Sequence, residues 1–348
     1  MCTWSNQAQN RERRSCNQEV ESSWPSAGEK SLNLLFSPYR GQHAITEKKM
    51  KNQQSSAMKG NPRRSGDFNE GYRMKIPSLK LVYFSPTGTT KKVVQGIARG
   101  LNYGSVEELD ITRPGARIQP LRTSENELLI IGLPVYMGRV PALAAEWLQV
   151  LQAHNTPAVC VVVYGNRAYE DALLEMTTIL TERGCRPIAG AAFIGKHSFS
   201  TADIPTAEGR PDADDLINAE LFGQKIGETL RSVSSATQIS KPKIPGCHPY
   251  RQQPCHPYRR DTVFWNVDFI AVSDACIQCG ICAEGCPVGA IDPDNSRAID
   301  TEHCITCCAC IRHCTQHART IKPGIVRDAS LRLYTLYKER KEPEYFLC

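Results

Sequence analysis

Cys276-Ile-Gln-Cys279-Gly-Ile-Cys282-Ala-Glu-Gly-Cys286-Pro287 is followed later in the chain by Cys304-Ile-Thr-Cys307-Cys308-Ala-Cys310-Ile-Arg-His-Cys314. Both stretches, which we call the first and second cysteine runs, have the spacing C-x2-C-x2-C-x3-C. In such runs three closely spaced thiolates bind one cubane iron–sulfur cluster, and the fourth cysteine reaches the other cluster. We therefore expect two [4Fe-4S] clusters that share their ligands crosswise. The expected ligands are Cys276, Cys279, Cys282 and Cys314 for one cluster, and Cys304, Cys307, Cys310 and Cys286 for the other.

Paired cysteines also have two alternative interpretations, a zinc knuckle and a redox disulfide. Structural zinc sites usually separate their two ligand pairs by about a dozen residues or more. Here four cysteines fall within eleven positions, and the arrangement occurs twice. The crowding favours iron–sulfur clusters over zinc.

At these residues the segment 268–322 resembles a bacterial-type ferredoxin with two [4Fe-4S] clusters, including Cys286-Pro287 and the following Ala290-Ile291. The second run departs from the family's pattern at two positions. Cys308 stands where glycine is usual, and Thr315 replaces the proline that follows the last ligand. We interpret Cys308 as a spare thiol beside the cluster, and we expect the departures to affect that cluster's potential and oxygen stability.

The composition is that of a protein with two or three domains. Of the 348 residues, 41% are hydrophobic and 22% are charged. No run approaches the roughly 18 apolar residues of a membrane span, and residues 1–30 lack the apolar core of a signal peptide. Half of the sixteen cysteines are the expected ligands in the two runs, where ligation requires reduced thiolates. We expect a cytoplasmic protein with no membrane partner, in a reducing cell such as that of an anaerobe.

Residues 1–75 carry the whole excess of positive charge. They hold 13 Lys and Arg against 7 Asp and Glu, whereas residues 76–348 hold 29 of each. Few apolar residues and no sustained periodicity predict a disordered extension. A basic arm for nucleic acid is the alternative, but the charges lack interleaved aromatic residues, so we expect no nucleic-acid partner.

The ordered pattern of the chain begins directly after Met74. We therefore hypothesise that translation starts at Met74. Intact-mass analysis of the native protein tests this, and a mass that includes residues 1–73 would refute it.

A strand, a hydroxyl-rich loop and a helix follow the basic extension. Residues 79–84 are apolar and β-rich, Ser85-Pro-Thr-Gly-Thr-Thr90 forms the loop, and a helical pattern covers residues 91–101. Backbone N–H groups and the helix dipole converge at such a junction and bind anions. The loop lacks the G-x-x-x-x-G-K-[ST] and Rossmann fingerprints of nucleotide sites. It suits a phosphate monoester such as that of FMN, with one donor removed by Pro86.

Apolar runs then alternate with helical patterns. The runs are at residues 106–111, 128–132, 158–164 and 188–194, and the helical patterns are at residues 142–152, 169–182 and 212–231. Together with residues 79–84 they predict an α/β fold, a doubly wound five-stranded parallel sheet. Ligands of such sheets lie at the carboxyl ends of the strands. The segments 134–141 and 164–169, which follow the third and fourth strands, are therefore candidate ligand loops.

Residues 76–231 together resemble flavodoxin, and the resemblance implies an FMN site. The phosphate ligands that it implies are Ser85, Thr87, Gly88, Thr89 and Thr90. The residues that it implies around the flavin ring are Pro134, Tyr136, Met137, Gly138, Tyr164, Gly165, Asn166 and Tyr169. Tyr136 and Tyr169 are candidates to stack on the ring, with ordinary packing as the alternative. His197-Ser198 could reach the flavin edge, and a structural histidine is the alternative there.

The expected domains follow from these patterns. They are a basic extension (1–75), a flavodoxin-like FMN domain (76–235), a Pro-rich linker (236–263), a small α+β two-cluster ferredoxin domain (264–325) and a helical tail (326–348). The linker repeats Cys-His-Pro-Tyr-Arg at residues 247–251 and 255–259. Its Cys-His pairs make metal binding an alternative, but its X-Pro bonds favour an extended tether.

Residues 76–322 as a whole resemble the flavodoxin–ferredoxin fusion proteins of anaerobes. The resemblance implies intracellular electron transfer between FMN and the clusters, to or from a partner oxidoreductase. A flavin-dependent reductase of a small substrate is the second hypothesis, and a regulatory iron–sulfur protein with a nucleic-acid-binding arm is the third. No G-x-S-x-G, H-E-x-x-H or NAD(P)H fingerprint occurs. The sequence leaves the direction of electron flow, the partner and the oligomeric state open.

Overall fold

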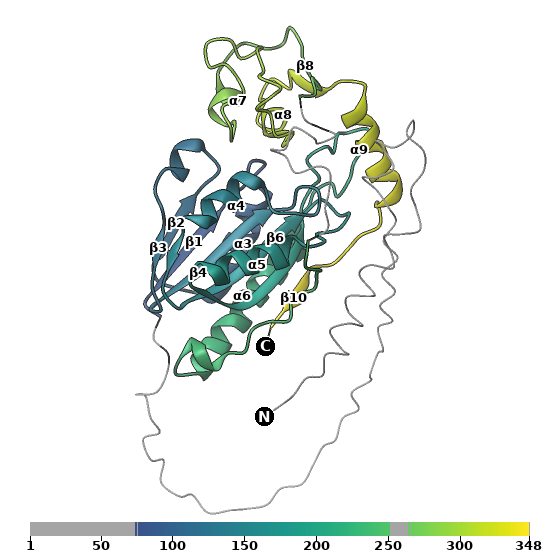
Figure 1. Ribbon diagram of the computed structural model, residues 1–348. Coiled ribbons are helices and arrows are strands. Elements are labelled where there is room, and N and C mark those ends of the chain that lie inside the picture. The colour runs from purple at the N-terminus through teal and green to yellow at the C-terminus, as the bar shows by residue number, and fades with distance from the viewer. Residues whose placement is uncertain (1–73, 75, 251–263, 265, 348) are drawn as a thin grey trace, which may run out of the picture.

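A six-stranded sheet forms the centre of the larger part of the protein (Figure 1). The computed structural model describes residues 74, 76–250, 264 and 266–347. The strands are β1 (Ser78–Tyr83), β2 (Val106–Asp110), β4 (Glu127–Pro134), β6 (Thr156–Tyr164), β7 (Cys185–Ile194) and β10 (Glu344–Phe346). The order β2-β1-β4-β6-β7 is parallel throughout. This is the flavodoxin-like order of a doubly wound sheet, which confirms the predicted fold class.

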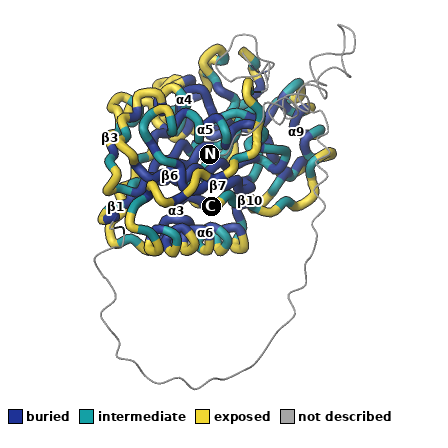
Figure 2. The backbone as a smooth tube through the Cα atoms, turned by 60° about the horizontal axis from the view of Figure 1, so that its bottom comes forward, coloured by how far each residue is buried: buried dark blue, intermediate teal, exposed yellow. Residues whose placement is uncertain are grey.

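Helices cover both faces of this sheet, as the view in Figure 2 shows. The helices α3 (Thr89–Leu101) and α6 (Ala213–Ser232) pack on one face, and α4 (Ala142–Gln149) and α5 (Ala172–Glu182) pack on the other. Every residue of β6 is buried, as is typical of a parallel strand covered on both sides. At Gly100 a Cβ atom would lie 1.9 Å from Glu220 O of α6, so the contact between α3 and α6 requires glycine there.

Short elements complete the larger part of the protein. β3 (Arg122–Thr123) pairs in parallel with β5 (Gln152–Ala153), and the 3-10 helices are η2 (Pro114–Arg117) and η3 (Ala236–Gln238). The strands and helices expected from periodicity all occur, with bounds shifted by a few residues.

The cysteine runs lie in a small module beside the sheet (Figure 1). Within it, β8 (Ile270–Val272) pairs antiparallel with β9 (Arg319–Ile321). The short helices α7 (Ile281–Glu284) and α8 (Ala309–Arg312) each lie inside one cysteine run. Apolar residues from β8, β9 and the cysteine runs form one buried cluster with α9 (Ile325–Leu336). This cluster also contains Phe199 from the loop after β7, so the module and the larger part of the protein share packing.

The segment after α9 differs from the expected helical tail, because it returns to the sheet. β10 pairs antiparallel with β7, with Tyr345 opposite Ala191, and the Tyr345 ring stacks on Phe222 of α6 with 5.1 Å between ring centroids. The sheet therefore has a sixth strand beyond the predicted five. Three residues are too few to show an alternating pattern, and the partner strand is far away in the sequence.

Some expectations fall outside the described part of the chain. They concern the extension at residues 1–73 and the second Cys-His-Pro-Tyr-Arg copy of the linker. Among the residues that are described, no helix has both the length and the apolar character needed to cross a bilayer.

Candidate functional site

A cleft lies where the carboxyl ends of β4, β6 and β7 face the cysteine-rich module. Its walls come from the loops after β1, β4, β6 and β7, and its roof consists of Phe264, Ile305, Thr306 and Leu333. The predicted cofactor residues that line it are Thr87, Thr89, Thr90, Pro134, Tyr136, Met137, Gly138, Tyr164 and Gly165. The empty space is about 1160 Å³, part of it open to solvent. A concave site lined by apolar side chains and a few hydroxyl groups is typical of small-molecule and cofactor sites.

The loop between β1 and α3 brings threonine side chains to one end of the cleft. The helix begins after Gly88, whose φ of +82° is left-handed, and Lys91 N donates to Ser85 Oγ at 3.0 Å. Thr90 is 1% exposed, and within the described chain its hydroxyl has no hydrogen-bond partner. An unpaired buried hydroxyl costs free energy, and a phosphate oxygen at the helix N-terminus would accept a hydrogen bond from it. The loop therefore fits the phosphate of FMN.

A tight turn holds Tyr136 and Met137 at the cleft. Tyr136 N donates to Arg139 O at 2.9 Å, and Arg139 N donates to Tyr136 O at 3.1 Å. Met137 and Gly138 have φ of 55° and 79°, the pattern of a type I′ turn. The Arg139 guanidinium also forms two hydrogen bonds with the Glu175 carboxylate, at 2.8 and 2.6 Å. These contacts fix the loop without help from a ligand.

Four predicted cofactor residues, Ser85, Gly88, Asn166 and Tyr169, do not line the cleft. The first two shape the threonine loop. The Tyr169 ring packs against Tyr164, with 5.5 Å between ring centroids, and its hydroxyl donates to Glu344 Oε2 at 2.8 Å. Asn166 Nδ2 donates to Tyr337 O at 2.6 Å. Both side chains bind the C-terminal segment, so of the two stacking candidates the structure places only Tyr136 at the cleft.

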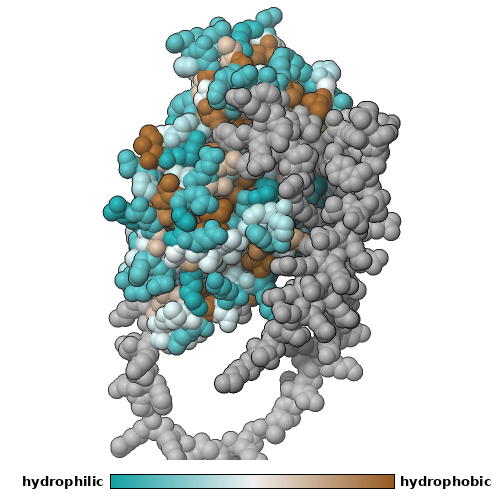
Figure 3. All heavy atoms as spheres, viewed as in Figure 1, coloured by the Kyte–Doolittle hydropathy of each residue, from teal (hydrophilic) through white to brown (hydrophobic). Residues whose placement is uncertain are grey.

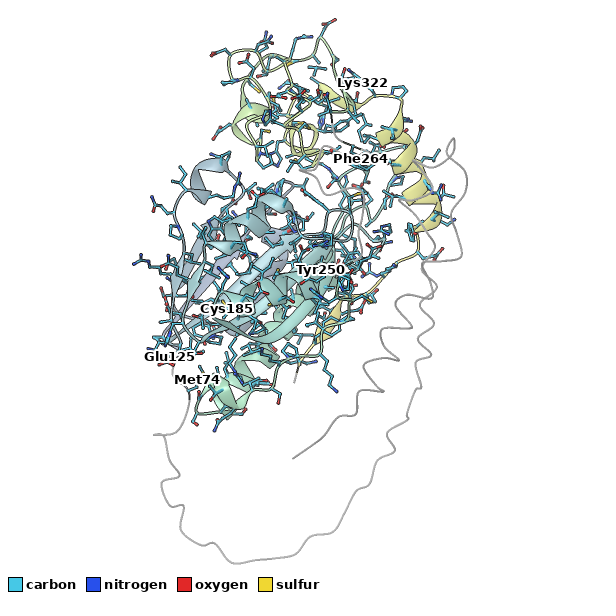
Figure 4. All side chains as sticks on the ribbon, viewed as in Figure 1. Met74, Glu125, Cys185, Tyr250, Phe264 and Lys322 are labelled. Atoms are coloured by element: carbon cyan, nitrogen blue, oxygen red, sulfur yellow. The ribbon has the colours of Figure 1, made fainter. Side chains whose placement is uncertain are left out.

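The roof of the cleft was not predicted from the sequence. The rings of Phe199 and Phe264 meet edge to face, with 5.6 Å between centroids, and Ser330 Oγ donates to Phe199 O at 2.7 Å. Figure 4 labels Phe264 near the junction of the sheet and the module. The roof residues come from the start of the expected ferredoxin domain, the second cysteine run and α9. Each of these three segments contributes only isolated residues, so no sequence pattern predicts that they border the same cleft.

His197 lines the cleft wall as a neutral hydrogen-bond donor. Its Nδ1 accepts a hydrogen bond from Phe199 N at 3.0 Å, so the neutral ring carries its proton on Nε2. Desolvation, together with the charges of Arg167 and Arg312, lowers the pKa of His197 to about 4. Arg312 Nη2 also donates to His197 O at 2.8 Å. The second cysteine run, to which Arg312 belongs, thereby fixes the loop that carries His197.

Four cysteines assigned to one cluster line a single, mostly apolar pocket. Cys286, Cys304, Cys307 and Cys310 all face this pocket, and they are the crosswise set expected from the spacing. Nowhere in the described ranges do three His, Cys, Asp or Glu side chains meet as they would around one metal ion. The thiolates of a cubane bind separate irons, so they surround a larger volume.

The other four expected ligands lie closer to the surface. Cys279 is exposed, Cys276 and Cys314 are partly buried, and Cys282 is buried. Ala318 N donates to Cys314 Sγ at 3.3 Å, and Ala290 N donates in the same way to Cys286 Sγ at 3.2 Å. Hydrogen bonds to sulfur are one of the features that set the potential of a cluster.

Arg319 provides a buried positive charge beside the pocket. It is 3% exposed, and one of its guanidinium nitrogens donates to Ser296 O. Its Nη1 has no hydrogen-bond partner among the described residues. Burial raises the pKa of Cys310 to about 12, and the charge of Arg319 opposes this rise. An uncompensated buried charge is costly, and an anionic cluster on four thiolates would compensate it, so the pocket fits a cluster.

The two cysteine runs share one backbone shape. Gln278 and Gly280 in the first run have φ of 53° and 77°, and Thr306 and Cys308, at the matching positions of the second run, both have φ of 57°. Residues of alternating hand turn successive N–H groups toward one point, which is a common way to surround an iron–sulfur site. The repeat seen in the spacing is therefore also a repeat of conformation.

Cys308 occupies the position that glycine has in the first run. It is 2% exposed, and its Sγ donates to Thr306 O at 3.8 Å. Burial raises its pKa well above the ordinary value. A thiol that is neutral and hydrogen-bonded agrees with the expectation of a spare thiol, although Cys308 also borders the pocket.

The comparisons with known proteins concern the two parts separately. Residues 269–315 match the model of the 4Fe-4S dicluster domain. No curated protein matches the chain. Among solved structures, an archaeal flavodoxin is 14% identical, with 44% of this chain and 98% of that chain covered and a TM-score of 0.32. A Streptococcus pneumonia flavodoxin is 16% identical, with 44% and 99% covered and a TM-score of 0.31.

A third solved structure is the rubredoxin oxygen:oxidoreductase of Desulfovibrio gigas. It is 13% identical, with 46% of this chain and 37% of that chain covered and a TM-score of 0.31. The fold assignment of the larger part rests on its own strand order, and the assignment of the module rests on the family match.

We expect the change Cys308→Gly to leave the iron content unchanged and to slow the loss of iron in air, because it removes a left-handed non-glycine residue that costs about 1–2 kcal/mol. Gly280→Ala is the matched change in the first run, where a Cβ would meet no atom within 4 Å but φ is +77°. It should speed the loss of iron. Iron assays over time measure both, and a lower initial iron content in Cys308→Gly would identify Cys308 as a ligand.

The pKa of His197 predicts a pH dependence of stability. The unfolded chain binds a proton near pH 6.5 that the folded chain does not bind until about pH 4, so stability falls as the pH drops through this window. His197→Gln removes this loss. We therefore compare the free energy of unfolding of the wild type with that of the variant. From pH 7 to pH 5 the wild-type value should fall by about 1–2 kcal/mol more than the variant value, a figure reduced to allow for solvent screening in the open cleft. Urea unfolding at both pH values measures these free energies, and in the exposed control His154→Gln the value should fall as much as in the wild type.

Proposed function

We propose that this chain is an iron–sulfur flavoprotein that transfers electrons between FMN and two [4Fe-4S] clusters, to or from a partner oxidoreductase. The chain joins a flavodoxin-like sheet to a 4Fe-4S dicluster domain. The observation that supports the proposal most strongly is the shared wall of the two sites. Ile305 and Thr306, which lie between the expected ligands Cys304 and Cys307, also line the cleft at the sheet.

FMN exchanges electrons singly or in pairs, whereas each cluster exchanges one, so the pair of cofactors joins the two kinds of chemistry. The residues of this chain would bind the cofactors and orient them. The threonine loop would bind the phosphate, the turn at Met137 and Gly138 presents Tyr136, and His197 offers an N–H donor. The apolar roof keeps water away from the space between the two sites.

The roof also favours electron transfer over the reduction of a small substrate. Phe199, Phe264 and Leu333 border the cleft on the side of the module, so the wall between the two sites is apolar. An electron crosses such a wall without an opening, whereas a small substrate would have to enter through the part of the cleft that is open to solvent. The hypothesis of a regulatory nucleic-acid-binding protein rested on residues 1–75, nearly all of which lie outside the described chain.

Anaerobic purification followed by iron, sulfide and flavin assays tests the proposal. Two cubanes and one flavin site require about eight iron and one FMN per chain. Thr90→Val removes the unpaired buried hydroxyl with little change in volume. A hydrogen bond to a charged group contributes about 1.5–3 kcal/mol, so the Kd for FMN should rise about tenfold or more.

Two variants serve as controls for Thr90→Val. Thr90→Ser keeps the hydroxyl and should keep the affinity. Thr181→Val removes a hydroxyl that donates to Thr177 O within α5, at 2.8 Å, and should not affect FMN. Fewer than four iron per chain, or the absence of flavin, would contradict the proposal. Reoxidation of the flavin that requires a small substrate would favour the reductase instead.

A further inference from the structure

The two cysteine runs have different surroundings, and the second run faces the sheet. Ile305, Cys307 and Ala309 belong to the same buried apolar cluster as the residues of β4, β6, α4 and α5. Ile305 is 4% exposed and borders both the cleft and the cysteine pocket. Arg312, the last residue of α8, donates to His197 O in the cleft wall. The second run is therefore enclosed on the side of the proposed flavin site.

The first run faces solvent. Cys279 is exposed, and the isoleucines two positions before and after it are 65% and 39% exposed, at Ile277 and Ile281 respectively. Single exposed apolar residues are normal, but here two of them flank an exposed expected ligand. In Figure 3 apolar residues appear among hydrophilic ones on the module at the top of the view. We call the exposed residues Ile277, Cys279 and Ile281 together the Ile277 surface.

The exposed charges of the module are almost all negative. In residues 268–322 the exposed acidic residues are Asp268, Asp274, Glu284, Asp292, Asp294, Asp300 and Glu302. Arg297 is the exposed basic residue of that segment, while Arg319 is buried and Arg312 and Lys322 are partly buried. Asp274, next to the first run, has a fully exposed side chain whose contact with Arg297 is long, at 3.5 Å. The Ile277 surface is thus apolar at its centre and lies on an acidic module.

We propose that the Ile277 surface is the docking site of a basic one-electron carrier protein, and that the second run connects it to the cleft. The inference rests on the proposed function, since it assigns the partner's place at the same pair of sites. In each encounter the partner and the chain exchange one electron, so one is oxidised and the other is reduced, and no bond is made or broken. An apolar centre provides the affinity of such a contact, and the acidic surroundings provide its rate and orientation.

The size of the surface indicates what kind of contact to expect. Two isoleucines and a cysteine edge form a small centre, which is typical of the weak, transient interfaces of electron-transfer proteins. Opposite charge raises the association rate of such encounters, and salt lowers it. The proposed partner therefore presents lysine or arginine around its own cofactor edge.

Cytochrome c, a basic haem protein, is a suitable probe of this surface. The anaerobic chain is reduced with dithionite, freed of excess reductant and mixed with ferricytochrome c, which takes up one electron per haem. In Ile277→Lys the second-order rate should fall about tenfold, which corresponds to a substantial interface residue. The affinity for zinc-substituted cytochrome c, which accepts no electron from the ground state, should fall in parallel when measured by titration calorimetry.

Ile217→Lys is the matched control, because Ile217 of α6 is 55% exposed and gains the same charge far from the module. Its rate and affinity should stay within about twofold of wild type, a change below 0.5 kcal/mol. Equal effects of the two substitutions would overturn the proposal. A wild-type chain that sediments as a dimer and is dissociated by Ile277→Lys would also overturn it, since the occupant would then be a second copy.

Iron and FMN contents of each variant are measured first. A wild-type chain that contains no cofactors would contradict the proposed function, whereas the docking proposal is tested only on chains that contain them. If Ile277→Lys does not load iron, the variant Asp274→Asn tests the docking proposal instead. The Asp274 side chain is fully exposed, so its replacement should leave the fold unchanged. It should weaken binding at low salt by about twofold to threefold more than Asp214→Asn, the control in the exposed first turn of α6. Equal losses in these two variants would overturn the proposal.

Discussion

The burial of Ile305 against the core of the sheet fixes the position of the cysteine-rich module relative to the sheet. This side chain borders the cleft on one side and the cysteine pocket on the other. Its neighbours in the chain, Cys304 and Thr306, are therefore fixed with respect to the loops of the sheet. The hydrogen bonds from Arg312 to His197 O and from Arg117 to Pro287 O orient the module around this apolar contact. Because dispersion and burial favour one close-packed arrangement, the distance between the two sites is set by packing.

Features encoded by neighbouring residues could be predicted from the sequence. The grouping of Cys286, Cys304, Cys307 and Cys310 around one pocket follows from their spacing, which is that of iron–sulfur ligands. The threonine loop follows from the strand, the hydroxyls and the helix start that succeed one another at residues 79–101. The parallel sheet follows from alternating apolar runs. In each case the physical cause acts within a short segment, so the pattern can be recognised in the sequence alone.

Features that depend on distant segments could not be predicted. Tyr169 was expected to contact the flavin, but its hydroxyl donates a hydrogen bond to Glu344 of β10. Asn166 binds a carbonyl of the same segment. The roof requires Phe264, Thr306 and Leu333 to meet, and each alone is an ordinary residue of its own element. Side chains of one loop can bind a cofactor or another part of the chain equally well, and only the three-dimensional arrangement distinguishes the two.

Because β10 belongs to the sheet, the cysteine-rich module is inserted in the sequence between two strands of the sheet and does not simply follow the last one. During synthesis the outer edge of β7 remains unpaired until the module has been made, because β10 follows the module in the sequence. An unpaired edge strand is prone to wrong pairing. The sheet is therefore completed only by residues that follow the whole module in the sequence. Until those residues are made, the edge of β7 has no strand to cover it.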